Sequence, residues 1–103
     1  MLPIDDARLW RRLEALAAIT EPDAPWTRRA FSPMHGRGRA WLKGVFAEAG
    51  LEAAVDAAGN LVGRRAGSVP GLKPIVLGSH SDTVPGGGRY DGLIEQLGGK
   101  PAP

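Results

Sequence analysis

The stretch of sequence that decides the fold spans residues 78–92 and reads Gly-Ser-His-Ser-Asp-Thr-Val-Pro-Gly-Gly-Gly-Arg-Tyr-Asp-Gly. A short apolar run, Ile-Val-Leu, precedes it, so residues 74–79 are predicted to form a strand buried on both faces. Polar side chains just past the carboxyl end of such a strand occupy the place where α/β sheets build their sites. The segment therefore predicts an α/β fold with a chemical site directly after this strand.

Three side chains in this segment are suited to a metal site. His80 and Asp82 are two positions apart, so an extended backbone would project both to the same face. A metal-bound imidazole usually has its other nitrogen held by a carboxylate or carbonyl, and Asp82 can supply that support or orient the site in another way. Residues 86–88 are all glycine and let the backbone bend, which returns Asp91 towards His80. His80 and Asp91 are therefore the candidate metal ligands.

Each of these residues also has an ordinary structural explanation. A histidine after a strand is more often a hydrogen-bonded surface residue than a ligand. Asp82 and Thr83 can cap a turn, and residues 86–88 can form a mobile loop or an anion-binding nest. Taken one at a time, the structural explanations are favoured, whereas the joint pattern is much more specific.

Two helices are predicted upstream of the segment. Residues 5–18 form an amphipathic pattern in which Asp5 or Asp6 can cap the first N–H groups. The apolar face of this pattern is Leu9, Leu13, Leu16 and Ala17. Two prolines then prevent continuation, so residues 20–30 are expected to be a polar connector.

The second helix is predicted to begin at Ser32, a good N-cap, followed by Pro33, whose missing N–H costs nothing at the first helical position. Its apolar spacing continues to Ala49, and Gly50 suits the left-handed position just past a helix end.

After this helix the spacing of apolar residues changes from helical to the alternation typical of β-strands. Residues 51–56 and 60–65 are predicted to pair as a hairpin around the turn sequence Ala-Ala-Gly-Asn, and residues 67–73 to form a loop. The order helix, helix, hairpin, buried strand and polar loop favours a layered α/β domain.

The amino-acid composition limits the kinds of chemical site that this chain can form. Hydrophobic residues are 43% and charged residues 23% of the chain, which is not the composition of a disordered protein. There is no cysteine, so disulfides, thiolate metal sites and cysteine nucleophiles are excluded, and a metal would need His, Asp or Glu. The two histidines are His35 and His80. His35 lies at the start of the second helix, where a structural role is favoured over ligation.

Membrane and nucleic-acid functions are disfavoured. No apolar run reaches the roughly 18 residues of a membrane helix, and the start of the sequence does not resemble a signal peptide, so a cytoplasmic protein is expected. The net charge is only +2. The arginine clusters lack interleaved aromatic residues and are expected to be solvated. These clusters are Arg8, Arg11 and Arg12, then Arg28 and Arg29, then Arg64 and Arg65.

The two glycine-rich motifs at residues 78–85 and 87–92 together resemble the first metal-binding segment of the M20-type metallopeptidase and amidohydrolase group. Within that group they are most similar to the N-carbamoyl-L-amino acid hydrolase, allantoate amidohydrolase and β-ureidopropionase branch. The same branch is suggested upstream by Thr-Arg-Arg-Ala-Phe-Ser-Pro at 27–33, Ala-Gly-Leu at 49–51 and Asp-Ala-Ala-Gly-Asn-Leu-Val-Gly at 56–63. The resemblance covers roughly residues 9–92.

The resemblance implies a two-domain, usually dimeric enzyme that hydrolyses linear amide or ureido C–N bonds of a small-molecule substrate. Two divalent ions, Zn²⁺, Mn²⁺ or Co²⁺, would activate a bridging water and polarise the scissile carbonyl. His80 would bind one ion, Asp91 would bridge both, and Asp82 would be the supporting catalytic carboxylate. Residues 1–92 would be the N-terminal portion of the metal-dependent catalytic domain, and residues 93–103 a glycine- and proline-rich tail, truncated or disordered.

Other parts of the family pattern have no match in this sequence. The catalytic Glu-Glu pair and the later histidine ligands are missing, and Glu95 lies in no such motif. Metal binding is therefore expected to be weak or absent, and the chain to be an inactive fragment that self-associates through uncovered apolar faces. The alternatives are a non-catalytic binding protein that retains the first metal segment, and an anion or nucleic-acid binder using residues 86–89 and the arginine pairs.

Overall fold

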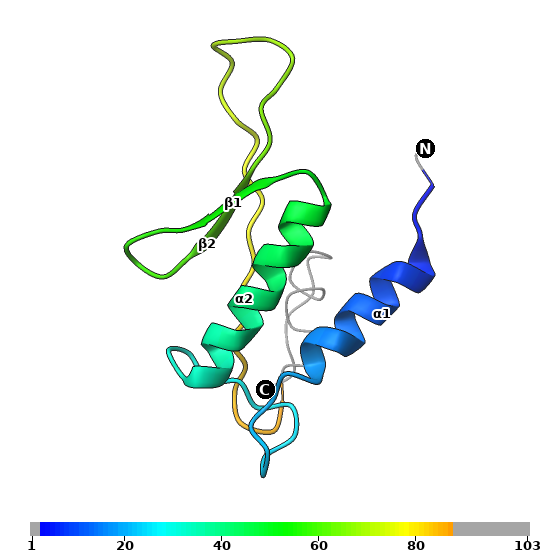
Figure 1. The fold of residues 1–103 in the computed structure, drawn as a ribbon, viewed down its shortest axis with the longest axis vertical. Helices are drawn as coiled ribbons and strands as arrows, with labels where there is room; N and C mark the ends of the chain where they lie inside the picture. The colour runs from blue at the N-terminus through cyan, green and yellow to red at the C-terminus, as the bar shows by residue number, and fades with distance from the viewer. Residues whose placement is uncertain (1–2, 88–103) are drawn as a thin grey trace. The chain divides into compact units, whose positions relative to one another are not determined.

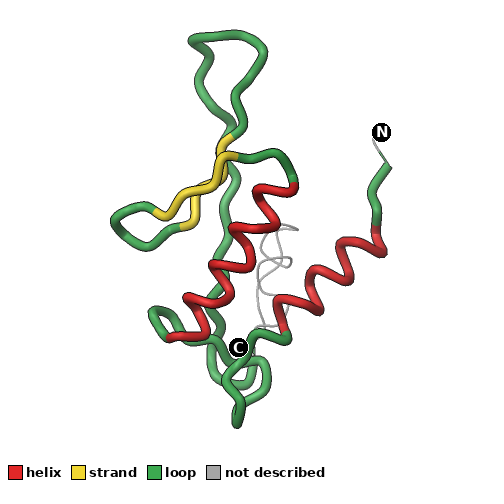
Figure 2. Tube along the Cα trace, in the orientation of Figure 1, coloured by secondary structure: helices red, strands yellow, loops and turns green. Residues whose placement is uncertain are grey.

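The computed structural model describes residues 3–87 (Figure 1). Within them the order of elements is α1 (Asp6–Ala17), α2 (Pro33–Glu48), β1 (Glu52–Val55) and β2 (Leu61–Arg64), an α/β arrangement. The described residues divide into two compact units, one joining residues 3–38 to residues 79–87 and the other spanning Arg39–Gly78. Figure 2 shows that everything after β2 in the described part is loop.

Helix α1 begins as the sequence predicts. The Asp5 side chain accepts a hydrogen bond from the backbone N–H of Arg8 at 2.9 Å, so Asp5 rather than Asp6 is the N-cap. Within the predicted apolar face, Ala17 is buried and Leu16 is half-buried, whereas Leu9 is exposed. Only the C-terminal half of α1 therefore packs against the rest of its unit.

The connector between the helices is more ordered than a polar loop. The hydroxyl of Thr20 donates to the carbonyl of Ala24 at 3.0 Å and accepts from the N–H of Thr27 at 2.9 Å. The N–H of Glu21 donates to the carbonyl of Thr27 at 2.9 Å. These bonds close the connector on itself, and Thr27 is completely buried at its end.

Helix α2 has the predicted signals at both ends. The Ser32 hydroxyl accepts from the N–H of His35 at 3.2 Å. At the other end, the N–H of Leu51 donates to the Phe46 carbonyl and that of Gly50 to the Ala47 carbonyl, each at 3.0 Å. With Gly50 at φ +82°, this is the Schellman pattern, which satisfies carbonyls that the helix leaves unpaired.

Gly50→Ala should lower the free energy of unfolding by about 1 kcal/mol, because an L side chain in the left-handed region is strained. Gly44→Ala is the matched control: Gly44 lies inside α2 with no atom within 4 Å of an added Cβ. This control should stabilise the helix by roughly 0.5–1 kcal/mol. Urea titrations followed by far-UV circular dichroism would measure both; equal midpoints for the two variants would contradict the assignment.

The predicted hairpin is present. Strands β1 and β2 pair antiparallel with Val55 opposite Leu61 and Glu52 opposite Arg64. The turn is closed by Asp56, whose carboxylate accepts from the N–H groups of Ala58 and Asn60 and from the Asn60 side chain at 2.9–3.0 Å. The Asn60 side chain, and then the backbone N–H groups, hold the pKa of Asp56 below its ordinary value.

The hairpin packs against the end of α2 at one close point. A Cβ added to Gly63 would lie 2.6 Å from Phe46 Cδ2 and 3.0 Å from Leu51 Cδ1. Phe46 and Leu51 are also the residues joined by the Schellman bond. The C-terminal end of α2, Leu51 just before β1, and strand β2 therefore pack together at Gly63. This position has no room for a side chain.

The prediction of a buried strand at residues 74–79 is wrong. The structure assigns no strand there, and Ile75, Val76 and Leu77 are 93%, 81% and 84% exposed. A strand buried on both faces needs neighbouring strands to pair its N–H and C=O groups and elements to cover each face. Among the described residues the hairpin strands pair only with each other, so nothing satisfies that requirement.

No helix in residues 3–87 is long and apolar enough to cross a membrane. Asp91, the far end of the 1–92 portion and the 93–103 tail lie outside the described residues.

Candidate functional site

His80 and Asp82 lie together in the structure. Nδ1 of His80 is 2.8 Å from the carbonyl oxygen of Asp82 and 3.2 Å from its carboxylate Oδ1. The two side chains are 37% and 40% exposed, so a solute can reach them. An Nδ1–H donating to these oxygens leaves Nε2 as the nitrogen that carries the lone pair for a metal. The pair has the chemistry of a supported imidazole ligand.

The described residues do not assemble a complete metal site. No group of three or more His, Asp or Glu side chains within residues 3–87 could hold an ion. The bridging carboxylate proposed from the sequence, Asp91, lies outside them. The ligand roles of His80 and Asp91 and the supporting role of Asp82 therefore stay predictions.

Thr83 anchors the segment that follows His80 to the connector. Its hydroxyl accepts from the N–H of Arg28 at 2.8 Å and donates to the carbonyl of Trp26 at 3.0 Å. Its own N–H donates to the Arg28 carbonyl at 2.8 Å. A fourth bond, from the N–H of Gly86 to the Thr27 hydroxyl at 2.9 Å, fixes the far end of the segment. Thr27 and Thr83 are buried, so these bonds are shielded from water.

The side chain of Arg28 makes a second set of bonds. Its Nε donates to the Ser81 carbonyl at 2.7 Å, and one terminal nitrogen donates to the carbonyls of Leu16 and Ile19 at 2.8 and 2.6 Å. Arg28 is only 6% exposed. Burial lowers the pKa of its guanidinium, and the nearby charge of Asp82 opposes that shift.

Sequence reasoning missed this cluster. Arg28 and Arg29 were predicted to be a solvated pair, which is wrong for Arg28. The side chain of Arg29 is 60% exposed and pairs with Glu21 at 3.2 Å, as a surface arginine does. Nothing in the spacing distinguishes the two neighbours. The burial of Thr27 and Arg28 depends on partners far along the chain, which no local pattern in the sequence reveals.

Two non-glycine residues beside the cluster have left-handed backbones, Trp26 at φ 57° and Phe31 at φ 60°. Such conformations cost free energy in bulky residues and persist only where surrounding bonds hold them. At Trp26 one bond that holds the backbone is donated by the Thr83 hydroxyl to the Trp26 carbonyl. Phe31 is held by its N–H, which donates to Nδ1 of His35 at 2.9 Å. This bond gives His35 the structural role expected at the helix start.

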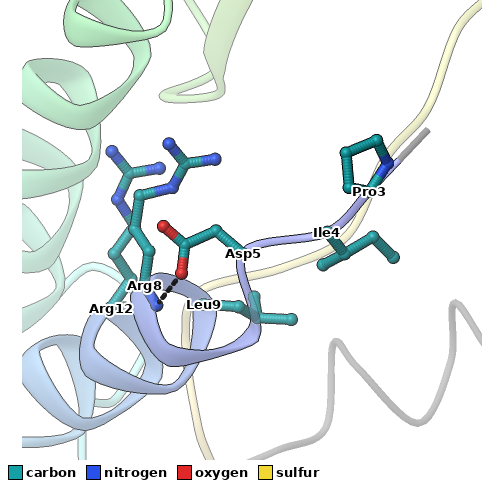
Figure 3. Close-up of a pocket in the computed structure, with 6 residues that line it drawn as sticks. All are labelled: Pro3, Ile4, Asp5, Arg8, Leu9 and Arg12. Carbon is teal, nitrogen blue, oxygen red and sulfur yellow. Dashed lines mark hydrogen bonds between the residues drawn. The ribbon is translucent and has the colours of Figure 1, made fainter.

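The structure also has an open hollow of about 280 Å³ at the start of α1 (Figure 3). Its walls are Pro3, Ile4, Asp5, Arg8, Leu9 and Arg12. No residue of the His80 segment lines it, and in Figure 3 the Asp5 carboxylate is occupied in capping the helix. The hollow is therefore separate from the candidate site.

Two of the known proteins similar to this chain are named as hydrolases of related kinds. The chain is 36% identical over 96 residues to a ureidoglycolate hydrolase of Oryza sativa subsp. japonica, covering 92% of the chain and 20% of the relative. It is 38% identical over 97 residues to an N-carbamoyl-L-amino acid amidohydrolase of Geobacillus stearothermophilus, covering 93% of the chain and 24% of the relative.

A solved structure agrees with these relatives. The crystal structure of a hydantoinase/carbamoylase family amidase from Burkholderia ambifaria matches 95% of this chain with a TM-score of 0.81 and 37% identity. The chain belongs to the carbamoylase branch of the M20-type amidohydrolases. It spans about a fifth to a quarter of the length of the curated relatives and 27% of the solved amidase chain. No protein-family model matches the sequence.

Proposed function

We propose that this chain supplies the first metal-binding segment of a metal-dependent amidohydrolase acting on linear amide or ureido C–N bonds. The observation that carries the proposal is the contact between His80 Nδ1 and Asp82 in a chain similar to carbamoylases over nearly all its length. N-carbamoyl amino acids and ureidoglycolate-type compounds are the proposed substrate class, consistent with the names of the relatives, and allantoate-type compounds follow from the sequence resemblance alone.

In this proposal His80, through Nε2, and Asp91 would hold divalent ions, and Asp82 would fix the imidazole of His80. A bound pair of divalent ions supplies an activated water and a polarised carbonyl. The donor set of imidazole and carboxylates suits Zn²⁺, Mn²⁺ and Co²⁺. The protein's own contribution is to hold the imidazole in one tautomer and orientation.

The 103-residue chain by itself is proposed to be inactive. It has two histidines, one of which is used structurally at the start of α2, and no Glu-Glu pair for the general base. One imidazole and one bridging carboxylate bind a single ion weakly. Hydrolysis of an N-carbamoyl amino acid by the purified chain would contradict this part of the proposal. The cytoplasmic location stays a prediction.

The metal-ligand assignment predicts that Zn²⁺ or Co²⁺ added to the ¹⁵N-labelled chain shifts or broadens the ring signals of His80. The apparent Kd should be in the millimolar range, which corresponds to a binding free energy of about −4 kcal/mol. The ring of His35 is the internal control, because its Nδ1 is held by Phe31 and its resonances should not follow the titration. His80→Ala should abolish the binding. Unchanged His80 signals at saturating metal would overturn the assignment.

A second candidate is favoured by one observation. Ile75, Val76 and Leu77 form an exposed apolar stretch, which marks an interaction surface in many proteins. A non-catalytic chain that docks a partner, or a second copy of itself, through this stretch would show a discrete complex in sedimentation velocity. Ile75→Lys should dissolve that complex. Of the arginine clusters, the pair Arg28 and Arg29 does not present two free cations to an anion, because Arg28 is buried and Arg29 is paired with Glu21.

A further inference from the structure

Asp82 is bracketed by bonds to a single residue. The carbonyl of Ser81, on its N-terminal side, accepts from the Arg28 guanidinium at 2.7 Å. Thr83, on its C-terminal side, exchanges two bonds with the Arg28 backbone, each at 2.8 Å. The peptide units on both sides of Asp82 are thus fixed by Arg28, and Ser81 is also the residue that separates Asp82 from His80.

The other face of the guanidinium is fixed to helix α1. One terminal nitrogen of Arg28 donates to the carbonyls of Leu16 and Ile19 at the C-terminal end of α1, where the Leu16 carbonyl also accepts from the N–H of Ile19 at 3.0 Å. The planar guanidinium cannot change the angle between its N–H groups, so it sets the position of the Ser81 carbonyl relative to the end of α1. Lysine has one nitrogen and cannot span the two sets of carbonyls in this way.

Helix α2 leaves room for this side chain. Gly38 is buried, and a Cβ added there would lie 2.9 Å from Arg28 Cδ, 3.2 Å from Arg28 Nε and 3.6 Å from Leu16 Cδ1. Glycine weakens a helix interior, so its presence at this point is explained by the space that Arg28 needs. Gly36, two residues earlier in the same helix, has no atom within 4 Å of an added Cβ.

We propose that Arg28, seated against Gly38, is the positioning residue that holds the His80–Asp82 pair in its ligand geometry. By fixing the backbone on both sides of Asp82, it keeps the Asp82 oxygens opposite Nδ1 of His80 and so directs Nε2 outward to a metal. Arg28 contacts neither metal nor substrate in this role. The part concerning metal affinity rests on the proposed function; the part concerning the tautomer of His80 does not.

The test compares the full chain with Arg28→Lys, Gly38→Ala and the control Gly36→Ala. Long-range ¹H–¹⁵N NMR, at a pH where imidazole is neutral, reads the tautomer of His80 directly. The wild type and Gly36→Ala should show the Nδ1–H tautomer, whereas Arg28→Lys and Gly38→Ala should show mixed tautomers. Amide signals of α1, which belongs to the same unit as Arg28, Gly38 and His80, report whether that unit is folded in each variant.

A Co²⁺ titration gives the second readout. Loss of a residue that orients a metal-binding histidine lowers metal affinity about 10- to 100-fold, so Arg28→Lys should weaken Co²⁺ binding about tenfold, Gly38→Ala less, and Gly36→Ala not at all. A purely structural role for Arg28 would lower the urea midpoint but leave the tautomer of the folded chain unchanged.

The outcomes are distinguishable. Folded Arg28→Lys and Gly38→Ala chains with the wild-type tautomer and Co²⁺ affinity would overturn the inference. If Arg28→Lys fails to fold, the result for Gly38→Ala tests the inference instead, because this variant keeps Arg28 but displaces its side chain. If the wild type binds no Co²⁺ while the tautomers still change as expected, the metal function fails and the positioning role of Arg28 stands.

Discussion

Thr83→Val should lower the free energy of unfolding of the unit that contains α1 by about 2–4 kcal/mol. Valine has the shape of threonine but no hydroxyl, so the N–H of Arg28 loses its acceptor and the carbonyl of Trp26 loses its donor. A buried polar group left without a partner costs about 1–3 kcal/mol. Because Thr83 is 8% exposed, water replaces the hydroxyl poorly.

The control for this prediction is Thr83→Ser, which retains the hydroxyl and removes one methyl group. We expect a loss of about 1 kcal/mol for the serine variant. Urea unfolding followed at the amide signals of α1 residues would separate this unit from the hairpin. A valine variant as stable as the serine variant would show that the hydroxyl bonds contribute nothing net.

Gly63→Ala is expected to have the second-largest effect, a loss of about 1–3 kcal/mol in the unit that contains the hairpin. The added Cβ would approach Phe46 Cδ2 to 2.6 Å and Leu51 Cδ1 to 3.0 Å, closer than carbon atoms tolerate. The phenyl ring must move, and with it the contact that joins the end of α2 to β2. Strand propensity favours alanine only slightly over glycine and does not offset the clash.

Gly67→Ala is the matched control, since Gly67 follows β2 and has no atom within 4 Å of an added Cβ. Its unfolding free energy should stay within about 0.5 kcal/mol of the wild type. The ring ¹H NMR signals of Phe46 and amide exchange in β1 and β2 would report the packing. The pair Ala54 and Val62 is the one whose N–H groups bond across the hairpin, and unchanged protection of these amides in Gly63→Ala would contradict the close contact.

Local signals in the sequence predicted the local structure. Asp5, Ser32 and Gly50 act through atoms three to five residues away, so capping rules identify them without any knowledge of the rest of the chain. The hairpin was likewise predictable, because the turn at residues 56–60 closes through its own side chains.

Features that depend on distant partners were not predictable. The apolar run at residues 74–79 has the composition of a buried strand, but burial requires covering elements, and the described residues supply none. Arg28 is the opposite case, because its charge and its arginine neighbour predict exposure. It is nevertheless buried, because it donates to three carbonyls and packs against Gly38. At the candidate site, the contact of His80 with Asp82 followed from a spacing of two residues, whereas the residues that hold Ser81 and Thr83 did not.

The bonds between the connector and the His80 segment join residues 53 to 59 positions apart in the sequence. Closing a loop of that length costs about 2 kcal/mol more chain entropy than closing the hairpin, whose paired residues Val55 and Leu61 are near neighbours. Helix α2 and the hairpin can therefore form early, within microseconds, from local contacts. We expect the candidate site to form after them. On a ribosome, Thr27 and Arg28 would stay without their partners until Thr83 and Gly86 had emerged, so the assembly of this site is tied to the timing of synthesis.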